Sequence, residues 1–447
     1  MNDTIVAIST ALGEGAISII RVSGDDAIKI INPLFDGKDL EKASSHMINY
    51  GHIVYNGEII DEVLLSIMKA PKTYTKEDVI EINTHGSIAV VNKIMEILLL
   101  EGCRLAEPGE FTKRAFLNGR IDLTESEGVM DLINSETELT RKMAINELSG
   151  NVSRLIIDTR EDIISLISNI EVNIDYPEYE DIEVVTINKI REKVREIKEK
   201  LLKTLKLSED GKILKDGIKT VILGKPNVGK SSLLNALLEE EKAIVTDVKG
   251  TTRDIVEGSI LVGGVKLNLI DTAGVRKSDD IVEKIGIEKS LNLIDEAELV
   301  LLILDASCPL SEEDKYLLEK TKDKKRIIIM NKIDLNLNNS YMDDVIKISA
   351  KNNEGIEDIK DAIKKLFNVG TFMSKNLTFF TNVRQISLLK SAIKSLEDVE
   401  QGIKEEREID MIEIDLKLVW EKLGDIIGAN YTEELIDNLF SRFCLGK

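Results

Sequence analysis

The sequence predicts a multidomain fold that combines α/β and purely α parts. Short β-like runs surround one helix at the start of the chain, which indicates an α+β domain. Apolar residues then recur at helical spacing in two stretches, and between these stretches short apolar strands alternate with helices. We therefore expect an N-terminal α+β domain (1–118), a split helical domain (119–215 and 373–447), and an α/β domain inserted between its parts (216–372).

Composition favours a globular chain and argues against direct gripping of bare RNA. The chain has 447 residues, of which 43% are hydrophobic and 31% charged, and its formal net charge is −21. A protein that holds RNA by its phosphates needs a dense surface of Lys and Arg, and no such run is present. An RNA substrate would therefore be gripped largely with a partner or by a local patch.

Cysteine use and hydropathy predict a cytoplasmic protein without a membrane segment. Cys103, Cys308 and Cys444 lie far apart without metal-ligand spacing, which indicates reduced thiols. The N-terminus lacks the basic start and apolar core of a signal peptide. No apolar run reaches the ~18 residues of a membrane span.

The expected elements follow the hydrophobic periodicity. In the first domain we expect strands Ile5–Ile8, Ala16–Val22, Glu62–Met68 and Val79–Asn83, and helix Ile88–Glu101. In the helical parts, which we expect to pack as one domain, the helices are Glu125–Ile133, Glu136–Leu148, Val152–Asn173, Ile187–Leu207, Gln385–Lys404 and Asp415–Ile426. The inserted domain carries strands Lys219–Leu223, Ile255–Leu261, Val265–Ile270, Leu299–Leu304, Arg326–Met330 and Val345–Ile348, mostly in a parallel sheet.

A phosphate-binding loop lies near the start of the inserted domain. Gly224-Lys-Pro-Asn-Val-Gly-Lys-Ser231 matches the pattern G-x-x-x-x-G-K-[ST], follows a predicted strand and opens a predicted helix. Backbone N–H groups of such a loop and the N-terminus of the helix hold nucleotide phosphates. Lys230 would reach the β- and γ-phosphates, and Ser231 would bind Mg²⁺. A glycine-rich turn without a ligand is the bland alternative, but three further motifs follow in the right order.

Two of these motifs predict recognition of guanine. Asn331-Lys-Ile-Asp334 follows one predicted strand, and Ser349-Ala-Lys351 follows the next. The Asp334 carboxylate can accept from the N1–H and 2-amino groups of guanine, which adenine does not offer. Asn331 would bind the base edge or brace the loop, and the Ala350 amide would face O6.

The residues alone do not select the catalytic group for hydrolysis. Asp271-Thr-Ala-Gly274 would place one carboxylate near Mg²⁺ and one amide at the γ-phosphate. The next residue, Val275, cannot orient water as a glutamine would. The acidic candidates that remain open are Asp279, Asp280, Glu283 and Glu288. The neutralising charge is likewise open between Arg253, Arg276 and a bound monovalent cation.

Four segments resemble the MnmE (TrmE) family of tRNA-modifying GTPases, and the resemblance covers the whole chain. Gly109–Leu123 resembles the family signature at the junction of its first two domains, and Phe443–Lys447 is similar to the C-terminal Cys-Ile-Gly-Lys. The phosphate loop and Gly250-Thr-Thr-Arg-Asp254, at the expected first switch, match as well. The resemblance implies that the inserted domain is a Ras-like P-loop GTPase domain.

The resemblance also implies a function. Family members are homodimers that join a flavin-dependent partner, MnmG, in a heterotetramer and modify C5 of the wobble uridine of tRNA by carboxymethylaminomethyl addition. They use GTP, Mg²⁺, K⁺ and a tetrahydrofolate derivative, in a 5-formyl or methylene form. The N-terminal domain is then a folate-binding and dimerisation domain.

Site residues follow by carry-over onto matching positions. Catalysis would rest on Glu283, which orients water, and on Lys230. The metal ligands would be Ser231 and Thr252 for Mg²⁺ and Asn227, Thr246, Val248 and Thr251 for K⁺. The nucleotide would contact Asn227, Val228, Gly229, Lys230, Ser231, Ser232, Thr246, Thr252, Asp271, Thr272, Ala273, Gly274, Asn331, Lys332, Asp334, Ser349, Ala350 and Lys351. Folate would contact Arg21, Glu81, Arg120 and Lys447.

Two other functions compete with this interpretation. A switch GTPase for ribosome assembly often carries a basic RNA-binding module with a G-x-x-G loop, which does not follow the GTPase domain here. A folate-dependent one-carbon enzyme with a regulatory GTPase domain is the other.

Cys444 matches a family cysteine, and a plain buried thiol is an equal interpretation of it.

Overall fold

The structure is a computed structural model that describes residues 3–175, 187–240, 256–270, 293–335, 344–373 and 377–446. The chain divides into two compact units, each assembled from segments that are distant in the sequence. The first unit comprises Met1–Met130, Ser153–Glu183 and Glu408–Lys447, and the second comprises Asp131–Val152 and Val184–Arg407.

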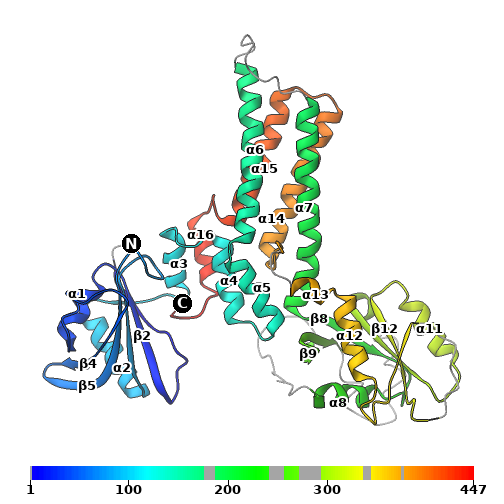
Figure 1. Cartoon of the computed structure of the whole chain (residues 1–447), viewed down its shortest axis with the longest axis horizontal. Helices are drawn as coiled ribbons and strands as arrows, with labels where there is room; N and C mark the ends of the chain where they lie inside the picture. The colour runs from blue at the N-terminus through cyan, green and yellow to red at the C-terminus, as the bar shows by residue number, and fades with distance from the viewer. Residues whose placement is uncertain are drawn as a thin grey trace. The chain divides into compact units, whose positions relative to one another are not determined.

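A seven-stranded sheet in the order β3-β4-β5-β6-β2-β1-β7 forms the centre of the first unit (Figure 1). Its strands are β1 (Ile5–Ile8), β2 (Gly15–Ser23), β3 (Phe35–Asp36), β4 (Met47–Tyr55), β5 (Glu58–Met68), β6 (Val79–Gly86) and β7 (Arg104–Leu105). Only the β1–β7 pair is parallel among these neighbours.

One face of this sheet is closed by α1 (Ala27–Ile31), the 3-10 turn η1 (Asn32–Leu34) and α2 (Ile88–Leu100). Strand β5 illustrates the alternation that produces this face, because Val63 and Leu65 are buried in the core while Leu64 between them is 46% exposed. The opposite face carries Arg21 on β2 directly across from Glu81 on β6. The pleat therefore places two predicted site residues side by side away from the core.

The remaining helices of the first unit are α3 (Glu110–Leu117), most of α4 (Leu123–Ile133), most of α6 (Asn151–Asp175), α15 (Ile409–Ile427) and α16 (Glu433–Phe440). Phe116 at the end of α3 packs in one apolar cluster with Leu123 and Phe440. Between α6 and α15, the Arg160 guanidinium lies 3.9 Å from the centre of the Trp420 ring.

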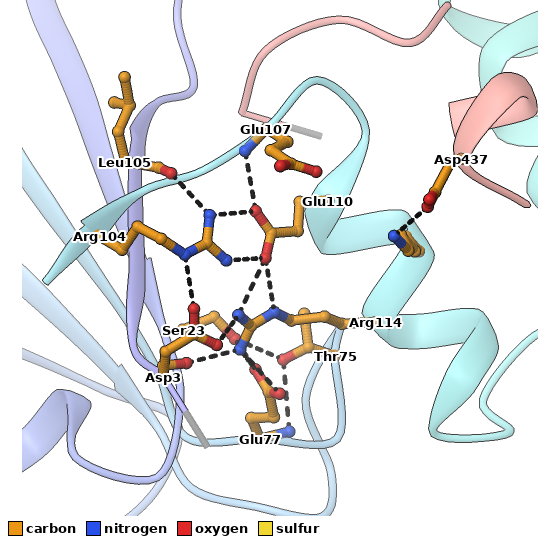
Figure 2. A network of polar contacts seen from close by, with 11 residues as sticks. Asp3, Ser23, Thr75, Glu77, Arg104, Leu105, Glu107, Glu110, Arg114 and Asp437 are labelled. Atoms are coloured by element: carbon orange, nitrogen blue, oxygen red, sulfur yellow. Dashed lines mark hydrogen bonds and ion pairs between the residues drawn. The ribbon is translucent and has the colours of Figure 1, made fainter. Parts of the chain in front are cut away.

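An ion-pair network joins the sheet to α3 (Figure 2). Arg114, whose side chain is 1% exposed, donates to Glu77 at 3.1 Å, to Glu110 at 3.0 Å and to Asp3 at 2.8 Å. Arg104 also pairs with Asp3 and Glu110. The buried guanidinium is thus surrounded by acceptors, which is the condition for burying a charge without a large cost.

The second unit contains a six-stranded sheet in the order β13-β12-β11-β8-β10-β9 (Figure 1). Its strands are β8 (Ile218–Leu223), β9 (Val256–Val262), β10 (Val265–Ile270), β11 (Leu299–Asp305), β12 (Arg326–Asn331) and β13 (Val345–Lys347). All neighbours pair in parallel except β9 and β10, which form a hairpin through Gly263 and Gly264, both at positive φ.

Helices α8 (Lys230–Glu240), α11 (Glu312–Lys320), α12 (Ile356–Leu366) and α13 (Val369–Phe372) belong to this α/β part. Strand β11 separates two cores, because Leu299, Leu301 and Ile303 pack on one side. Its alternate residues Val300, Leu302 and Leu304 pack on the other. The sheet is therefore buried on both faces, as a parallel sheet requires.

The second unit also includes helices α5 (Glu138–Leu148), α7 (Ile187–Asp216) and α14 (Val383–Lys404). Lys198 on α7 forms ion pairs with Glu400 at 2.7 Å and Glu397 at 3.5 Å on α14. In each unit, therefore, a helix before the inserted α/β domain packs against one after it. That all of these helices form one split domain stays a prediction. Within the described part of the chain, no helix is long and apolar enough to cross a membrane.

Candidate guanine-nucleotide site

The predicted phosphate loop joins the end of β8 to the start of α8 through a backbone that demands glycine twice. Gly224 has φ +150° and Gly229 has φ +99°. A Cβ at Gly224 would collide with the Ile303 carbonyl of β11, and one at Gly229 would collide with the Asn331 side chain. Asn227 between them lies in the left-handed region, at φ +60°. The loop is therefore pressed tightly against the neighbouring strands.

Lys230 opens α8, and its ammonium group lies in the curve of the loop. Its Nζ donates to the carbonyl oxygens of Gly224 at 2.7 Å and Lys225 at 3.0 Å. Ser231 and Ser232 follow in the first turn and are exposed. The arrangement combines a cation, two hydroxyl groups and a helix N-terminus, which is a set of groups suited to phosphate.

Asn331, the last residue of β12, connects the phosphate loop to the segment Ser349–Lys351 that follows β13. The side chain is 3% exposed, its Nδ2 donates to the Val228 carbonyl at 2.8 Å, and its Oδ1 accepts from the Ala350 amide at 3.0 Å. These contacts match the predicted bracing role, and the contact with the base edge stays a prediction. A guanine O6 would have to share the Ala350 amide with Asn331.

Lys332 is held at φ +67° beside a carboxylate that the sequence analysis did not identify. Its Nζ lies 2.6 Å from Asp305 Oδ2, and Asp305 Oδ1 accepts from the Ser307 amide at 2.9 Å and its hydroxyl at 2.6 Å. Burial acts to raise the pKa of Asp305, but the hydrogen bonds from Lys332 and Ser307 outweigh it and lower that pKa. The available signal was its position at the carboxyl end of a buried strand beside β8.

Asp334 lies exposed in the loop that follows β12, where its Oδ1 accepts from the Ser349 hydroxyl at 2.7 Å. Ser349 is fully buried and exchanges two backbone hydrogen bonds with Glu354, at 3.0 and 3.1 Å. Lys351 is exposed. The structure thus brings the phosphate loop and both base motifs to the carboxyl ends of parallel strands.

Several predicted residues lie outside the described part of the chain. They are Thr246, Val248, Thr251, Thr252, Arg253, Asp271, Thr272, Ala273, Gly274, Val275, Arg276, Asp279, Asp280, Glu283, Glu288 and Lys447. Their roles stay predictions.

Three of the residues predicted to contact folate, Arg21, Glu81 and Arg120, lie on the first unit, and both arginines contact rings of one small apolar cluster. The Arg21 guanidinium donates to Glu81 at 2.9 Å and to the Gly446 carbonyl at 3.1 Å, and it lies 5.6 Å from the centre of the Phe111 ring. The Arg120 guanidinium lies 4.7 Å from the centre of the Tyr74 ring, which packs against the same cluster as Phe111. The structure therefore pairs Arg21 with Glu81 beside Gly446, and it places Arg120 on a ring that packs against the same cluster as Phe111.

None of the three cysteines forms a disulfide, and the three lie in different surroundings. Cys103 is buried, and desolvation raises its pKa to about 12, so it stays a protonated thiol at neutral pH. Cys308 is half-buried. Cys444 is exposed, so its interpretation as a buried thiol is wrong.

Known proteins match this chain over its full length. Residues 4–120 match the family described as GTP-binding protein TrmE N-terminus, and residues 123–444 match the MnmE helical domain. The tRNA modification GTPase MnmE of Streptococcus thermophilus is 53% identical over 450 residues, covering 100% of this chain and 98% of its own. That of Streptococcus pneumoniae serotype 2 is 52% identical over 452 residues, covering 100% and 99%.

Solved structures match more weakly. The G domain of the T. maritima FeoB iron transporter is 32% identical, covers 33% of this chain and 98% of its own, and has a TM-score of 0.24.

Proposed function

Since the chain belongs to the MnmE family of tRNA modification GTPases, we propose that it hydrolyses GTP as the nucleotide-dependent part of a tRNA-modifying complex. The complex adds a carboxymethylaminomethyl group to C5 of the wobble uridine, and its second component is a flavin-dependent MnmG protein. The observation that carries this proposal is the Asn331 bridge, which holds the phosphate loop and the guanine motifs in one site.

Lys230 and the loop amides bind the β- and γ-phosphates of GTP in this proposal. To do so, the Lys230 ammonium exchanges the carbonyls of Gly224 and Lys225 for phosphate oxygens. Ser231, Thr252 and Asp271 offer hydroxyl and carboxylate oxygens, the ligands that Mg²⁺ prefers. Bound Mg²⁺ offsets the charge that develops on the phosphate oxygens.

Base selection rests on Asp334. Its carboxylate accepts from two guanine N–H groups, and the Ser349 hydroxyl already orients it. Adenine would leave these acceptor positions unpaired, which is a costly mismatch.

For hydrolysis, we propose that Glu283 orients the attacking water and that K⁺ supplies the positive charge of an arginine finger. Asn227, Thr246, Val248 and Thr251 would hold that cation. Asn227 is exposed in the left-handed bend of the phosphate loop, which is compatible with a ligand role. Pairing of two GTPase domains around GTP and K⁺ would then rearrange the helices of a homodimer.

The N-terminal domain would bind a tetrahydrofolate derivative as one-carbon donor. Arg21, Arg120 and Lys447 can pair with the glutamate tail, and Glu81 can accept from the pterin amino group. The Arg21–Glu81 pair and the stacking of Arg120 on Tyr74 are compatible with an acidic aromatic ligand. Loss of 5-formyl-tetrahydrofolate binding in Glu81→Gln, measured by titration calorimetry, is the expected result.

We expect the protein to act in the cytoplasm, and a reconstituted reaction under matching conditions tests the main proposal. Unmodified tRNA is incubated with this chain, a purified MnmG flavoprotein, GTP, K⁺, methylene-tetrahydrofolate and an amine donor, and its nucleosides are analysed by mass spectrometry. We expect a modified wobble uridine that disappears with Lys230→Ala or without GTP. Brisk GTP hydrolysis without any modified nucleoside, together with binding to ribosomal subunits, would favour the assembly GTPase.

A further inference from the structure

An ion pair anchors the second residue of the phosphate loop to a neighbouring helix. Lys225 Nζ lies 2.7 Å from Asp314 Oδ2 in the first turn of α11. The Asp314 side chain is 3% exposed and that of Lys225 is 19% exposed. Most ion pairs among the described residues lie on the surface, where such pairs contribute little, so a pair with one buried partner is a different case.

Hydrogen bonds at the start of α11 fix the Asp314 side chain independently of Lys225. Its Oδ2 accepts from the amide and the hydroxyl of Ser311, both at 2.9 Å, and the Asp314 amide donates back to Ser311 Oγ at 3.3 Å. This reciprocal capping fixes the carboxylate on the start of α11. Among the described residues, Asp314 Oδ1 has no hydrogen-bond partner. Lys225 is therefore a main source of compensation for this buried charge.

The anchored residue touches the phosphate-binding lysine directly. The Lys225 carbonyl accepts from Lys230 Nζ at 3.0 Å, so the side chain of Lys225 is fixed by Asp314 while its backbone contacts Lys230. Asp305, the last residue of β11, pairs with Lys332 in a similar way. The end of β11 and the start of α11 thus each provide one carboxylate, paired with a lysine from a different nucleotide motif.

We propose that Asp314 is a positioning residue for nucleotide binding, which fixes the phosphate loop through Lys225 so that Lys230 and the loop amides meet the phosphates of GTP. This inference rests on the proposed function, because it assumes that the site takes a guanine nucleotide. It adds α11 to the elements that determine affinity, although no residue of α11 belongs to the nucleotide motifs.

Substitution of Lys225 and substitution of Asp314 should affect the stability of the fold differently. Lys225→Met removes the cation and leaves a buried carboxylate unpaired, which is strongly destabilising. Asp314→Asn removes the charge but keeps an oxygen that can accept from Ser311, and it leaves only a lysine that can turn to solvent. The double variant should therefore melt at a higher temperature than Lys225→Met alone. If the pair positions the loop, the double variant should nevertheless bind nucleotide as poorly as the single variants.

The experiment measures the affinity of a fluorescent GDP analogue and the melting temperature of the full chain. We expect binding roughly tenfold weaker in Lys225→Met, in Asp314→Asn and in the double variant, and restored to within about threefold by Lys225→Arg. Lys315→Met is the matched control, since Lys315 lies on α11 and pairs on the surface with Glu312, and its affinity should equal that of the wild type.

Each outcome decides something. Wild-type affinity in all three variants would overturn the positioning role, even if their melting temperatures fell. Affinity that recovers in the double variant together with stability would also overturn it, because the effect would then be structural. A wild-type chain that binds no guanine nucleotide would overturn the proposed function as well as this inference.

Discussion

At the scale of single residues, Asp334 gives the sharpest prediction. Asparagine at this position offers one acceptor and one donor, which complement the N1–H and the C2 carbonyl of xanthine instead of the two donors of guanine. We expect Asp334→Asn to lose about a hundredfold in affinity for GDP and to gain affinity for xanthosine diphosphate. Competition against a fluorescent nucleotide measures both.

Asp358→Asn is a suitable control for that experiment, because Asp358 lies in the first turn of α12 outside the site. Equal losses for guanine and xanthine nucleotides in Asp334→Asn would contradict the base-reading role and indicate a disturbed loop.

Single residues also show where sequence reasoning stops. The motif at Asn331 could be found from its order after the phosphate loop, but its two roles could be separated only by the buried contacts to Val228 and Ala350. The pairing of Lys225 with Asp314 was not predictable, because the two residues are far apart in sequence and each resembles an ordinary surface charge. A helix cap and a buried partner become visible only when the fold brings them together.

At the scale of elements, the start of α3 depends on Gly109. This residue has φ +70°, and a Cβ there would lie 2.5 Å from the Phe440 carbonyl and 2.8 Å from Phe443 Cβ. Gly102 also has a positive φ, of +106°, but a Cβ there would meet nothing within 4 Å. Gly109→Ala and Gly102→Ala should each lower the free energy of unfolding by about 1–2 kcal/mol, because of backbone strain.

Gly109→Ala should lose more than that, because α16 must also shift away. Thermal melting of the two variants measures the difference, and similar melting temperatures would show that the contact with α16 yields without cost.

The ion-pair network at α3 predicts a dependence of stability on pH. The hydrogen bond from Arg104 and the positive charges of Arg104 and Arg114 lower the pKa of Asp3. Burial acts to raise the pKa of Glu110, but Arg104, the Glu107 amide and Arg114 outweigh it, so that pKa is lowered as well. A carboxyl whose pKa is lower in the folded chain stabilises the fold above its unfolded pKa and loses this contribution as the pH falls through the folded value.

We therefore expect α3 to lose protection from hydrogen exchange as the pH falls below about 4, near the unfolded carboxyl pKa values. Glu110→Gln should lower stability at pH 7 by about 2 kcal/mol and flatten this acid dependence. Glu138→Gln, which changes an exposed pair on α5, should do neither. An unchanged acid profile in Glu110→Gln would remove the network as its cause.

Element prediction succeeded where one face of a strand is apolar and failed where it is not. All four strands predicted for the first domain occur, while the two-residue strands β3 and β7 were missed, and so was β4 (Met47–Tyr55). Its inward positions include Asn49 and Gly51, while Ile48 and Tyr50 are exposed, so the usual apolar signal is inverted. Gly51 is required because a Cβ would collide with the Asp36 carbonyl and the Phe35 ring. Helix α16, with 8 residues, was too short for periodicity to reveal.

At the scale of the whole molecule, the proposed cation mechanism predicts a choice between salts. GTP hydrolysis should be at least tenfold faster in K⁺ than in Na⁺ at equal ionic strength, because the smaller ion fits a site for K⁺ poorly. Asn227→Ala and Glu283→Ala should both lose this stimulation, while Asn352→Ala, an exposed change beside the base loop, should keep it. Equal rates in the two salts would refute the roles of Asn227 and Glu283.

Because β11 separates two cores, few of its positions should tolerate substitution. Leu301 and Leu302 are neighbours in the chain, yet one packs in each core. In most half-buried strands every second position accepts a polar residue, whereas here each position from Leu299 to Leu304 is fully buried. A library of random substitutions should therefore show an unbroken run of intolerance along this strand. Substitutions at alternate positions would disturb different cores, so they would reveal how each side of the sheet in the GTPase domain is packed.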